Sequence, residues 1–305
     1  MRKIKKCVAL MLVALMTLSL YVTGYAADEN KSEEDKKEFT VYSSEFPDAY
    51  IITELLNEDN IENRNGEKNL VTIKATVFVE ENYAYINDEL IISDSRLLSK
   101  DEVEAIGIDN FDDLNPDSNV PTQGRSTNSR GKLSITFSGT YSMVGSGVSV
   151  NLNGYANWNG FDTIYTPANN PAVGNDFLGI AWSGGYQVSS SNCYARWNVG
   201  GAQNVYLSDA VPNAGRVYAF DEFANAGGKY MIYVSQADIS ATLTKNSLTG
   251  GANKAEAIMK YIHTYQSGIG NINISASISS VGLGFSLSNT PKQWSLSCTL
   301  GGLPY

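Results

Sequence analysis

The stretch Gln123-Gly124-Arg125-Ser126-Thr127-Asn128-Ser129-Arg130-Gly131-Lys132 divides this chain of 305 residues into two regions of different composition. Residues 28–130 hold 25 acidic and 10 basic residues, a net charge of −15. Residues 131–305 hold 7 acidic and 8 basic residues, a net charge of +1. We therefore expect an acidic N-terminal region over residues 27–110 and a β-rich domain over residues 132–305. Proline, asparagine and serine without periodicity predict an exposed linker over residues 111–131.

The first 26 residues have the pattern of a secretory signal peptide. Four basic residues precede an apolar run, Val8 to Leu20, that is too short to span a bilayer. Small residues at Gly24 and Ala26 predict cleavage after Ala26. We expect a secreted protein, the alternative being an uncleaved anchor.

The acidic region predicts a small α+β unit. Residues 28–38 carry dense charge and no apolar side chain, which predicts disorder. Apolar residues at every second position from Val71 to Val79 predict a strand. Ser99-Lys100-Asp101-Glu102 is a capping box that predicts a helix to about Ile106.

The expected linker contains two basic residues, Arg125 and Arg130, and exposed loops of this kind are where proteases cut. One hypothesis is a propeptide that is removed after Arg125 or Arg130. The other is an ordinary interdomain linker.

The second region has the alternation of half-buried antiparallel strands. Apolar residues occupy odd positions from Leu133 to Met143, with serine and threonine between them, and Val148, Val150 and Leu152 continue after a glycine turn. Repeated glycine pairs punctuate further segments. The pattern predicts a mainly β fold, an antiparallel β-sandwich or flattened barrel. One helix is expected inside it, capped at Asn253 and ended at Gly268.

Two cysteines follow the signal peptide, Cys193 and Cys298. An exported protein can join them in a disulfide, and two buried free thiols are the alternative. Two cysteines and one distant histidine do not make a zinc site. We expect no cofactor and no metal.

The residues of the second region give little support to an enzyme. The single histidine, His263, falls in the expected helix, and we interpret it as part of the scaffold. There is no Gly-x-Ser-x-Gly elbow, no His-Glu-x-x-His and no phosphate loop. Asp221 and Glu222 are adjacent, and neighbours on a strand point to opposite faces, so they do not form a glycosidase pair. We expect no catalytic residue.

Aromatic residues gather among asparagine, serine and glycine between positions 155 and 197, a composition suited to stacking against sugars. The candidates for ligand binding are Trp158, Tyr165, Trp182, Tyr194 and Trp197, and Tyr155 and Tyr186 belong to the same group. The alternative is that most of these side chains form the core of the β fold.

The preferred function is that of a non-enzymatic exported β-domain protein that binds an extracellular surface or a glycan. Residues 133–161 and 264–291 carry no charged side chain and consist of apolar, hydroxyl, amide and glycine residues. A membrane-inserting β-hairpin requires such a composition. A β-pore-forming toxin or bacteriocin is therefore the alternative, with a membrane as partner in that case alone. A secreted hydrolase is the least favoured. The absence of a basic patch excludes a nucleic-acid partner, and the oligomeric state stays open.

Overall fold

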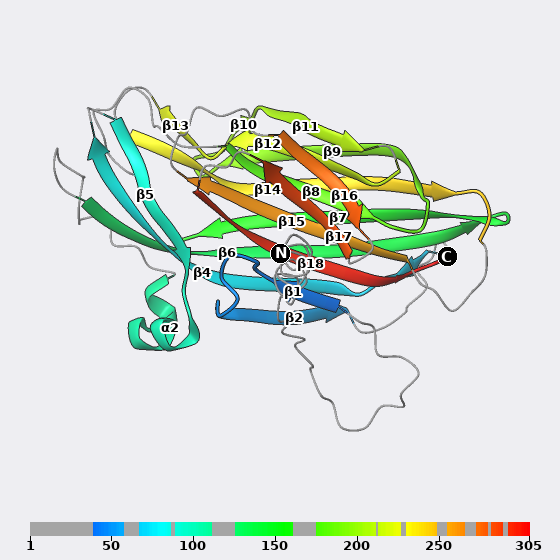
Figure 1. Cartoon of the computed structure of the whole chain (residues 1–305), viewed down its shortest axis with the longest axis horizontal. Helices are drawn as coiled ribbons and strands as arrows, with labels where there is room; N and C mark the ends of the chain where they lie inside the picture. The colour runs from blue at the N-terminus through cyan, green and yellow to red at the C-terminus, as the bar shows by residue number, and fades with distance from the viewer. Residues whose placement is uncertain are drawn as a thin grey trace, which may run out of the picture.

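The computed structural model describes residues 39–57, 67–86, 89–111, 126–160, 175–211, 213–226, 230–248, 255–265, 273–279, 282–288 and 292–305. The fold is mainly β and antiparallel, as the alternation predicts (Figure 1). Two large sheets pack face to face and form a sandwich, and a small hairpin forms a third sheet.

The six-strand sheet has the order β1 (Phe39–Tyr42), β18 (Lys292–Leu303), β15 (Ala255–Tyr265), β8 (Asn175–Trp182), β12 (Gly215–Asp221) and β11 (Val205–Val211). The ten-strand sheet has the path β10 (Ala202–Gln203), β9 (Gln187–Trp197), β14 (Tyr230–Lys245), β7 (Gly147–Asn159), β6 (Ser126–Val144), β4 (Thr72–Ile86) and β2 (Ile51–Asn57). Its remaining strands are β13 (Phe223–Ala226) beside β14, β3 (Lys68–Asn69) beside β6 and β5 (Glu89–Leu97) beside β4.

The main core lies between these two sheets. On β7, Val150 and Leu152 are fully buried, while the asparagines between and after them lie on the other face. The sheets approach closely at Gly154, where an added Cβ would come within 2.7 Å of the Met259 sulfur on β15. A glycine at this position therefore allows the two layers to meet.

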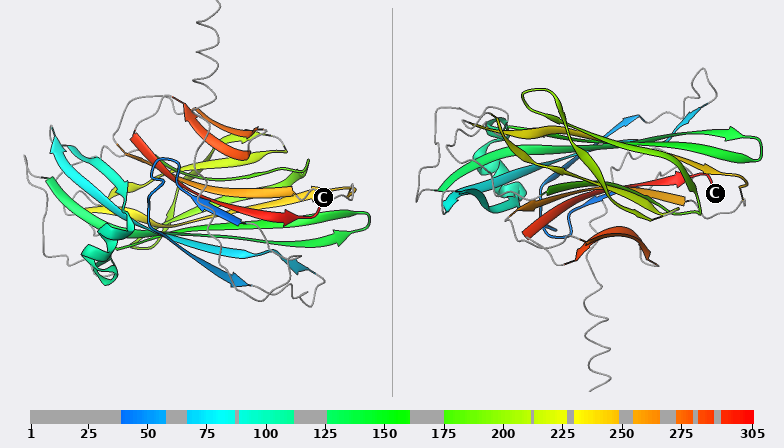
Figure 2. Two further views of the ribbon diagram at one scale, coloured as in Figure 1. Left: turned by 60° about the horizontal axis from the view of Figure 1, so that its bottom comes forward. Right: turned by 90° about the horizontal axis from the view of Figure 1, so that it is seen from above.

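The third sheet is the hairpin of β16 (Asn273–Ser279) and β17 (Gly282–Ser288). β16 lies against β11 and β12, and β17 lies against β8 and β15. Figure 2 shows this hairpin as a separate layer over the outer face of the six-strand sheet. Apolar residues of that outer face, including Phe177 and Ile262, form a second buried cluster.

The prediction of a helix between Asn253 and Gly268 is wrong for residues 255–265, which the structure describes. Residues 255–265 form β15, which pairs with β18 on one side and β8 on the other. Because β15 is central and covered on both faces, it is apolar without alternation, and Ile258, Met259 and Ile262 then imitate a helical spacing. Asn253 and Gly268 lie outside the described residues.

The acidic region contributes strands to both large sheets. β4 pairs with β6 from Ile73–Phe137 to Ala84–Ser126, and β1 pairs with β18. The prediction of a linker over residues 111–131 is therefore wrong for residues 126–131, which belong to β6. The predicted domain boundary between residues 131 and 132 falls inside that strand. A segment this small buries its alternating apolar residues by completing larger sheets.

The expected short helix is present. α2 (Lys100–Ile106) follows Ser99, whose backbone N–H donates to Glu102 Oε2 at 2.9 Å, and Gly107 ends it with a φ of 89°. The 3₁₀ helix η1 (Ile108–Phe111) comes next and buries Phe111 against Phe78. Both pack beside the base of β4 and β5 (Figure 1).

Candidate functional site

The two predicted tryptophans nearest the core are not available to a ligand. Trp158 and Trp182 have 4% and 0% of their surface exposed. Trp158 Nε1 donates to Tyr261 Oη at 2.7 Å across the sandwich, and Trp182 Nε1 donates to the Tyr186 carbonyl at 3.2 Å. The hypothesis that these two bind a ligand is wrong. Tyr165 lies outside the described residues.

Tyr194, by contrast, lies on the outer face of the ten-strand sheet with 40% of its surface exposed. The Arg196 guanidinium lies 5.0 Å from its ring centroid. Trp197, at the end of the same strand, is partly buried and packs against the core. Of the predicted aromatic residues that the structure describes, Tyr194 is therefore the most exposed.

A second exposed tyrosine lies in the same cross-strand row. Asp238 on β14 pairs with Tyr194 on β9 and with Tyr155 on β7. Tyr155 has 38% of its surface exposed, and Thr136 on β6 continues the row. Because neighbouring strands are about 4.8 Å apart, the two tyrosines stand about 10 Å apart on either side of Asp238.

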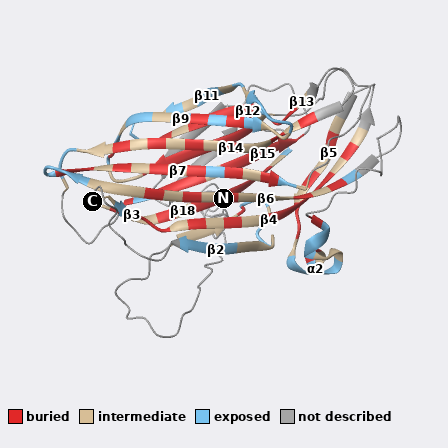
Figure 3. Ribbon diagram, turned by 180° about the vertical axis from the view of Figure 1, so that it is seen from behind, coloured by how far each residue is buried: buried red, intermediate tan, exposed pale blue. Residues whose placement is uncertain are grey.

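The flanking rows of this face carry amides and hydroxyls. Asn192, Ser240, Asn153 and Ser138 form the row on one side, and Arg196, Gln236, Asn157 and Ser134 form the row on the other. Gln236 Nε2 donates to Asp238 Oδ1 at 2.7 Å. Figure 3 shows that partly and fully exposed positions alternate with buried ones along β7 and β14. We call Tyr155, Tyr194, Asp238 and these two rows the tyrosine–amide face.

Strand phase could have identified this face. In β7 the even-numbered Val148, Val150 and Leu152 point into the core, so Trp158 must also point inward and Tyr155 outward. Composition alone groups these aromatic residues together, whereas the phase of the strand separates Tyr155 from Trp158.

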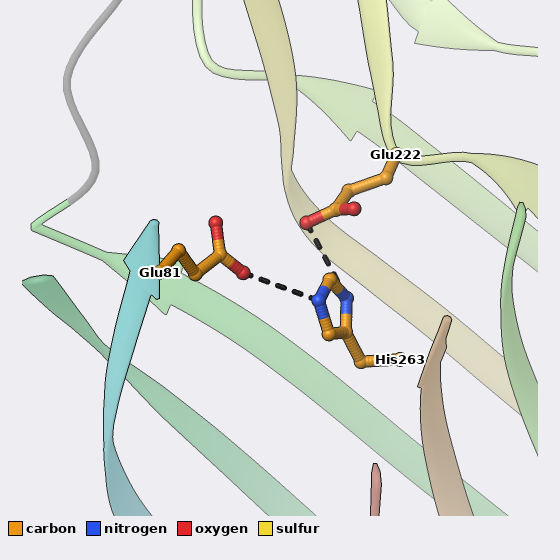
Figure 4. Close-up of side chains that lie close together, drawn as sticks. All are labelled: Glu81, Glu222 and His263. Carbon is orange, nitrogen blue, oxygen red and sulfur yellow. Dashed lines mark ion pairs between the residues drawn. The ribbon is translucent and has the colours of Figure 1, made fainter. Parts of the chain in front are cut away.

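A second polar group is buried between the sheets. His263 on β15 lies among Glu81 on β4, Asp176 on β8 and Glu222 at the bend after β12, and none of the four is more than 5% exposed. His263 Nε2 is 3.2 Å from Glu81 Oε1, and Nδ1 is 3.1 Å from Asp176 Oδ1 and 3.5 Å from Glu222 Oε1. Figure 4 shows Glu81 and Glu222 directed at the imidazole from different parts of the chain. We call these four residues the His263 cluster.

Aromatic and hydroxyl groups hold the carboxylates in place. Tyr83 Oη donates to Glu81 Oε2 at 2.5 Å, and Ser95 Oγ donates to Glu81 Oε1 at 3.3 Å. On the other side, Tyr261 Oη donates to Asp176 Oδ2, and the Thr264 N–H donates to Asp176 Oδ1 at 3.2 Å. Glu81 and Asp176 are therefore fixed by donors besides the histidine.

Burial and mutual repulsion determine the protonation of the cluster. Burial, together with the carboxylates of Asp176 and Glu81, raises the pKa of Glu222 well above its usual range, against the opposing effect of His263. Burial alone would lower the pKa of His263, but Glu222 and Asp176 outweigh it and raise that pKa. The interpretation of His263 as a scaffold residue in a helix missed this environment, which four distant positions in the sequence create.

Of the two predicted cleavage sites in the linker, Arg130 lies within a strand. It belongs to β6, and its Nε donates to Glu80 Oε2 at 2.9 Å. Ala26 and Arg125 lie outside the described residues, so cleavage at either stays a prediction. Cys193 on β9 and Cys298 on β18 are both buried free thiols, which contradicts the disulfide. The two residues lie on strands of different sheets.

Comparisons with known proteins leave the function open. No family model and no curated protein matches the chain. A search of solved structures returned the collagen adhesin (CNA) from S. aureus at 9% identity and a TM-score of 0.21, covering 71% of this chain and 86% of that chain. Within the described residues, no helix is both long and apolar enough to cross a membrane.

Proposed function

We propose that this chain is a non-enzymatic, exported β-sandwich protein that binds a glycan, or a surface covered with glycans, through the tyrosine–amide face. The observation that carries the proposal is the row Tyr194–Asp238–Tyr155. It places two exposed rings on either side of a carboxylate on one sheet face.

The chemistry of this face suits sugars. The faces of a tyrosine ring pack against the C–H groups of a pyranose, while carboxylate, amide and hydroxyl groups bond its hydroxyls. The strands that carry the two rings are two strand spacings apart, about 10 Å, which is about the length of two sugar units. Asn153, Asn157 and Asn192 lie in the rows beside the rings and supply donors and acceptors.

A non-enzymatic role agrees with the position of the only histidine. His263 has none of its surface exposed, and the carboxylates next to it are buried with it. A general acid or base must reach the substrate directly or through one water. The tyrosine–amide face has a single carboxylate in its central row, Asp238, which provides no pair for glycoside hydrolysis.

The first experiment is a glycan array and a pull-down on insoluble polysaccharides with the secreted chain. We expect retention on a neutral polysaccharide or oligosaccharide class, lost in the double variant Tyr155→Ala/Tyr194→Ala. Tyr206→Ala is the matched control, because Tyr206 is 49% exposed on β11, in the other sheet. Retention that is the same in all three proteins would contradict the proposal.

A membrane-inserting hairpin is the second candidate. β16 and β17 form a separate two-strand sheet over the six-strand sheet, and residues 273–288 include no charged side chain. Detachment of this layer would release an uncharged amphipathic hairpin. Dye release from liposomes, before and after trypsin treatment, tests it. Concentration-dependent leakage would favour the pore, and its absence under both conditions would remove it.

A further inference from the structure

We propose that Glu81, Glu222 and His263 bind a divalent transition-metal ion, with Zn²⁺ the best match, that joins β4 of the ten-strand sheet to β15 of the six-strand sheet. This site is independent of the tyrosine–amide face and lies inside the sandwich (Figure 4).

The possible donor atoms of three residues converge on one place in the interior. A ring nitrogen of His263 and one carboxylate oxygen each from Glu81 and Glu222 all lie within 4.8 Å of one another. His263 Nε2 and Glu81 Oε1 are 3.2 Å apart. Two ligands at about 2.1 Å from a tetrahedral Zn²⁺ are separated by about 3.4 Å, so this pair needs little movement.

The surroundings fix the histidine as a ligand through Nε2. A carboxylate only accepts hydrogen bonds, so Asp176 Oδ1, 3.1 Å from Nδ1, requires a hydrogen on Nδ1. In the neutral ring this leaves a lone pair on Nε2, which lies 3.2 Å from Glu81 Oε1. An imidazole whose other nitrogen donates to a carboxylate is the usual arrangement around a metal-bound histidine. Asp176 is therefore a positioning residue.

Two buried atoms of the His263 cluster lack a hydrogen-bond partner. Among the described residues, neither His263 Nε2 nor Glu222 Oε2 has a hydrogen-bond partner, and both side chains are more than nine-tenths buried. Buried polar atoms without partners are rare and costly. An ion held by Nε2 and Glu222 Oε2 would satisfy both atoms, with Glu222 Oε1 left 3.5 Å from Nδ1.

The charge of the cluster also calls for a cation. No lysine or arginine in the described part of the chain pairs with Glu81, Asp176 or Glu222. With these three ionised and His263 protonated the cluster would carry a net charge of −2 in the interior. Such an excess is expensive to bury. A divalent ion supplies two positive charges at the place where the carboxylates converge.

The donor set favours Zn²⁺ over Ca²⁺ or Mg²⁺. An imidazole nitrogen suits Zn²⁺ and its transition-metal neighbours, whereas Ca²⁺ and Mg²⁺ prefer oxygen alone. Tyr83 and Ser95 hold Glu81 from behind, as outer partners of a metal ligand do.

The test uses the full secreted chain, stripped with EDTA and then titrated with Zn²⁺, Mn²⁺ and Ca²⁺. We expect one equivalent of Zn²⁺ to remain after dialysis, measured by mass spectrometry of the metal. Glu222→Gln and His263→Gln should bind at least about 100-fold more weakly, and Asp176→Asn about 10- to 100-fold more weakly. Asp238→Asn, a carboxylate change on the outer face, should bind as the parent does.

Thermal unfolding separates binding from folding. Zn²⁺ should raise the midpoint of the parent and of Asp238→Asn, and leave Glu222→Gln unchanged. In EDTA, Glu222→Gln should melt at or above the parent, because it removes a buried carboxylate. X-ray absorption of the parent's bound zinc should show nitrogen and oxygen ligands and no sulfur, even if every variant fails to fold. A folded parent that retains none of the three ions, or retains Zn²⁺ as well in Glu222→Gln and His263→Gln, would overturn the proposal and leave a proton as the cluster's cation.

Discussion

His263 on β15 and Glu81 on β4 join the two sheets of the sandwich, with Nε2 3.2 Å from Oε1. The pair also joins the acidic N-terminal region to the C-terminal strands. In metal-free protein, His263→Ala leaves three buried carboxylates without the imidazole, and breaking such a pair costs about 3–5 kcal/mol.

This loss should appear as a lower urea midpoint at neutral pH. Asn192→Ala on the outer face is the control and should stay within about 0.5 kcal/mol of the parent. The folded fraction of His263→Ala should bind glycan within a few-fold of the parent, because the His263 cluster is away from the tyrosine–amide face. Unchanged stability of His263→Ala would show that the cluster carries no net charge to balance.

Cleavage at the linker should not release the acidic region. If trypsin cuts after Arg125, residues 39–111 remain paired through β4 with β6 and through β1 with β18. We expect two fragments on a denaturing gel and one peak in native size-exclusion chromatography. Two separate native peaks would support a removable propeptide instead.

The two cysteines should be unreactive in the native state and both reactive after unfolding. Burial raises the pKa of Cys193 to about 12 and raises that of Cys298 as well, so neither thiol ionises near neutral pH. A thiol reagent should label none in native protein and two per mature chain in denaturant. Labelling of none in denaturant without reductant would reveal a disulfide.

Acid should weaken the attachment of α2. The side-chain hydrogen bond from Arg96, with help from Ser99, lowers the pKa of Glu102 to about 2. A lowered folded-state pKa stabilises the fold above the unfolded value near 4.5, and that contribution is lost as the pH falls toward about 2. Exposure of the pair to solvent keeps the effect small.

The measurement is an NMR titration of the Glu102 carboxyl, with unfolding followed from pH 5 to pH 2. Glu102→Gln should lose this part of the pH dependence. A Glu102 midpoint at its ordinary value would contradict the pairing with Arg96.

Local pattern predicted much of the fold. Alternation from Val71 to Val79 and from Leu133 to Met143 identified β4 and β6, and the capping box at Ser99 identified α2. The pattern failed at β15, because a central strand covered on both faces has no alternation. The pattern also failed at residues 126–131, because a polar segment without periodicity can still pair as part of a strand.

The candidate sites were predicted less well. Tyr194 was predicted, and the phase of β7 could have separated exposed Tyr155 from buried Trp158. The His263 cluster assembles positions 81, 176 and 263 from strands of both large sheets and position 222 from the bend after β12. No spacing in the sequence indicates that these residues meet, since the register of the two sheets alone brings them together.

The most direct test of the proposed function is calorimetric titration of the parent, Tyr194→Ala, Tyr155→Ala and Tyr206→Ala with the soluble oligosaccharide that the array identifies. Removing an aromatic contact from a binding face costs about 1 kcal/mol or more. We predict at least about fivefold weaker binding for Tyr194→Ala and Tyr155→Ala, and unchanged binding for Tyr206→Ala. Equal affinities in all four folded proteins would contradict binding at the tyrosine–amide face.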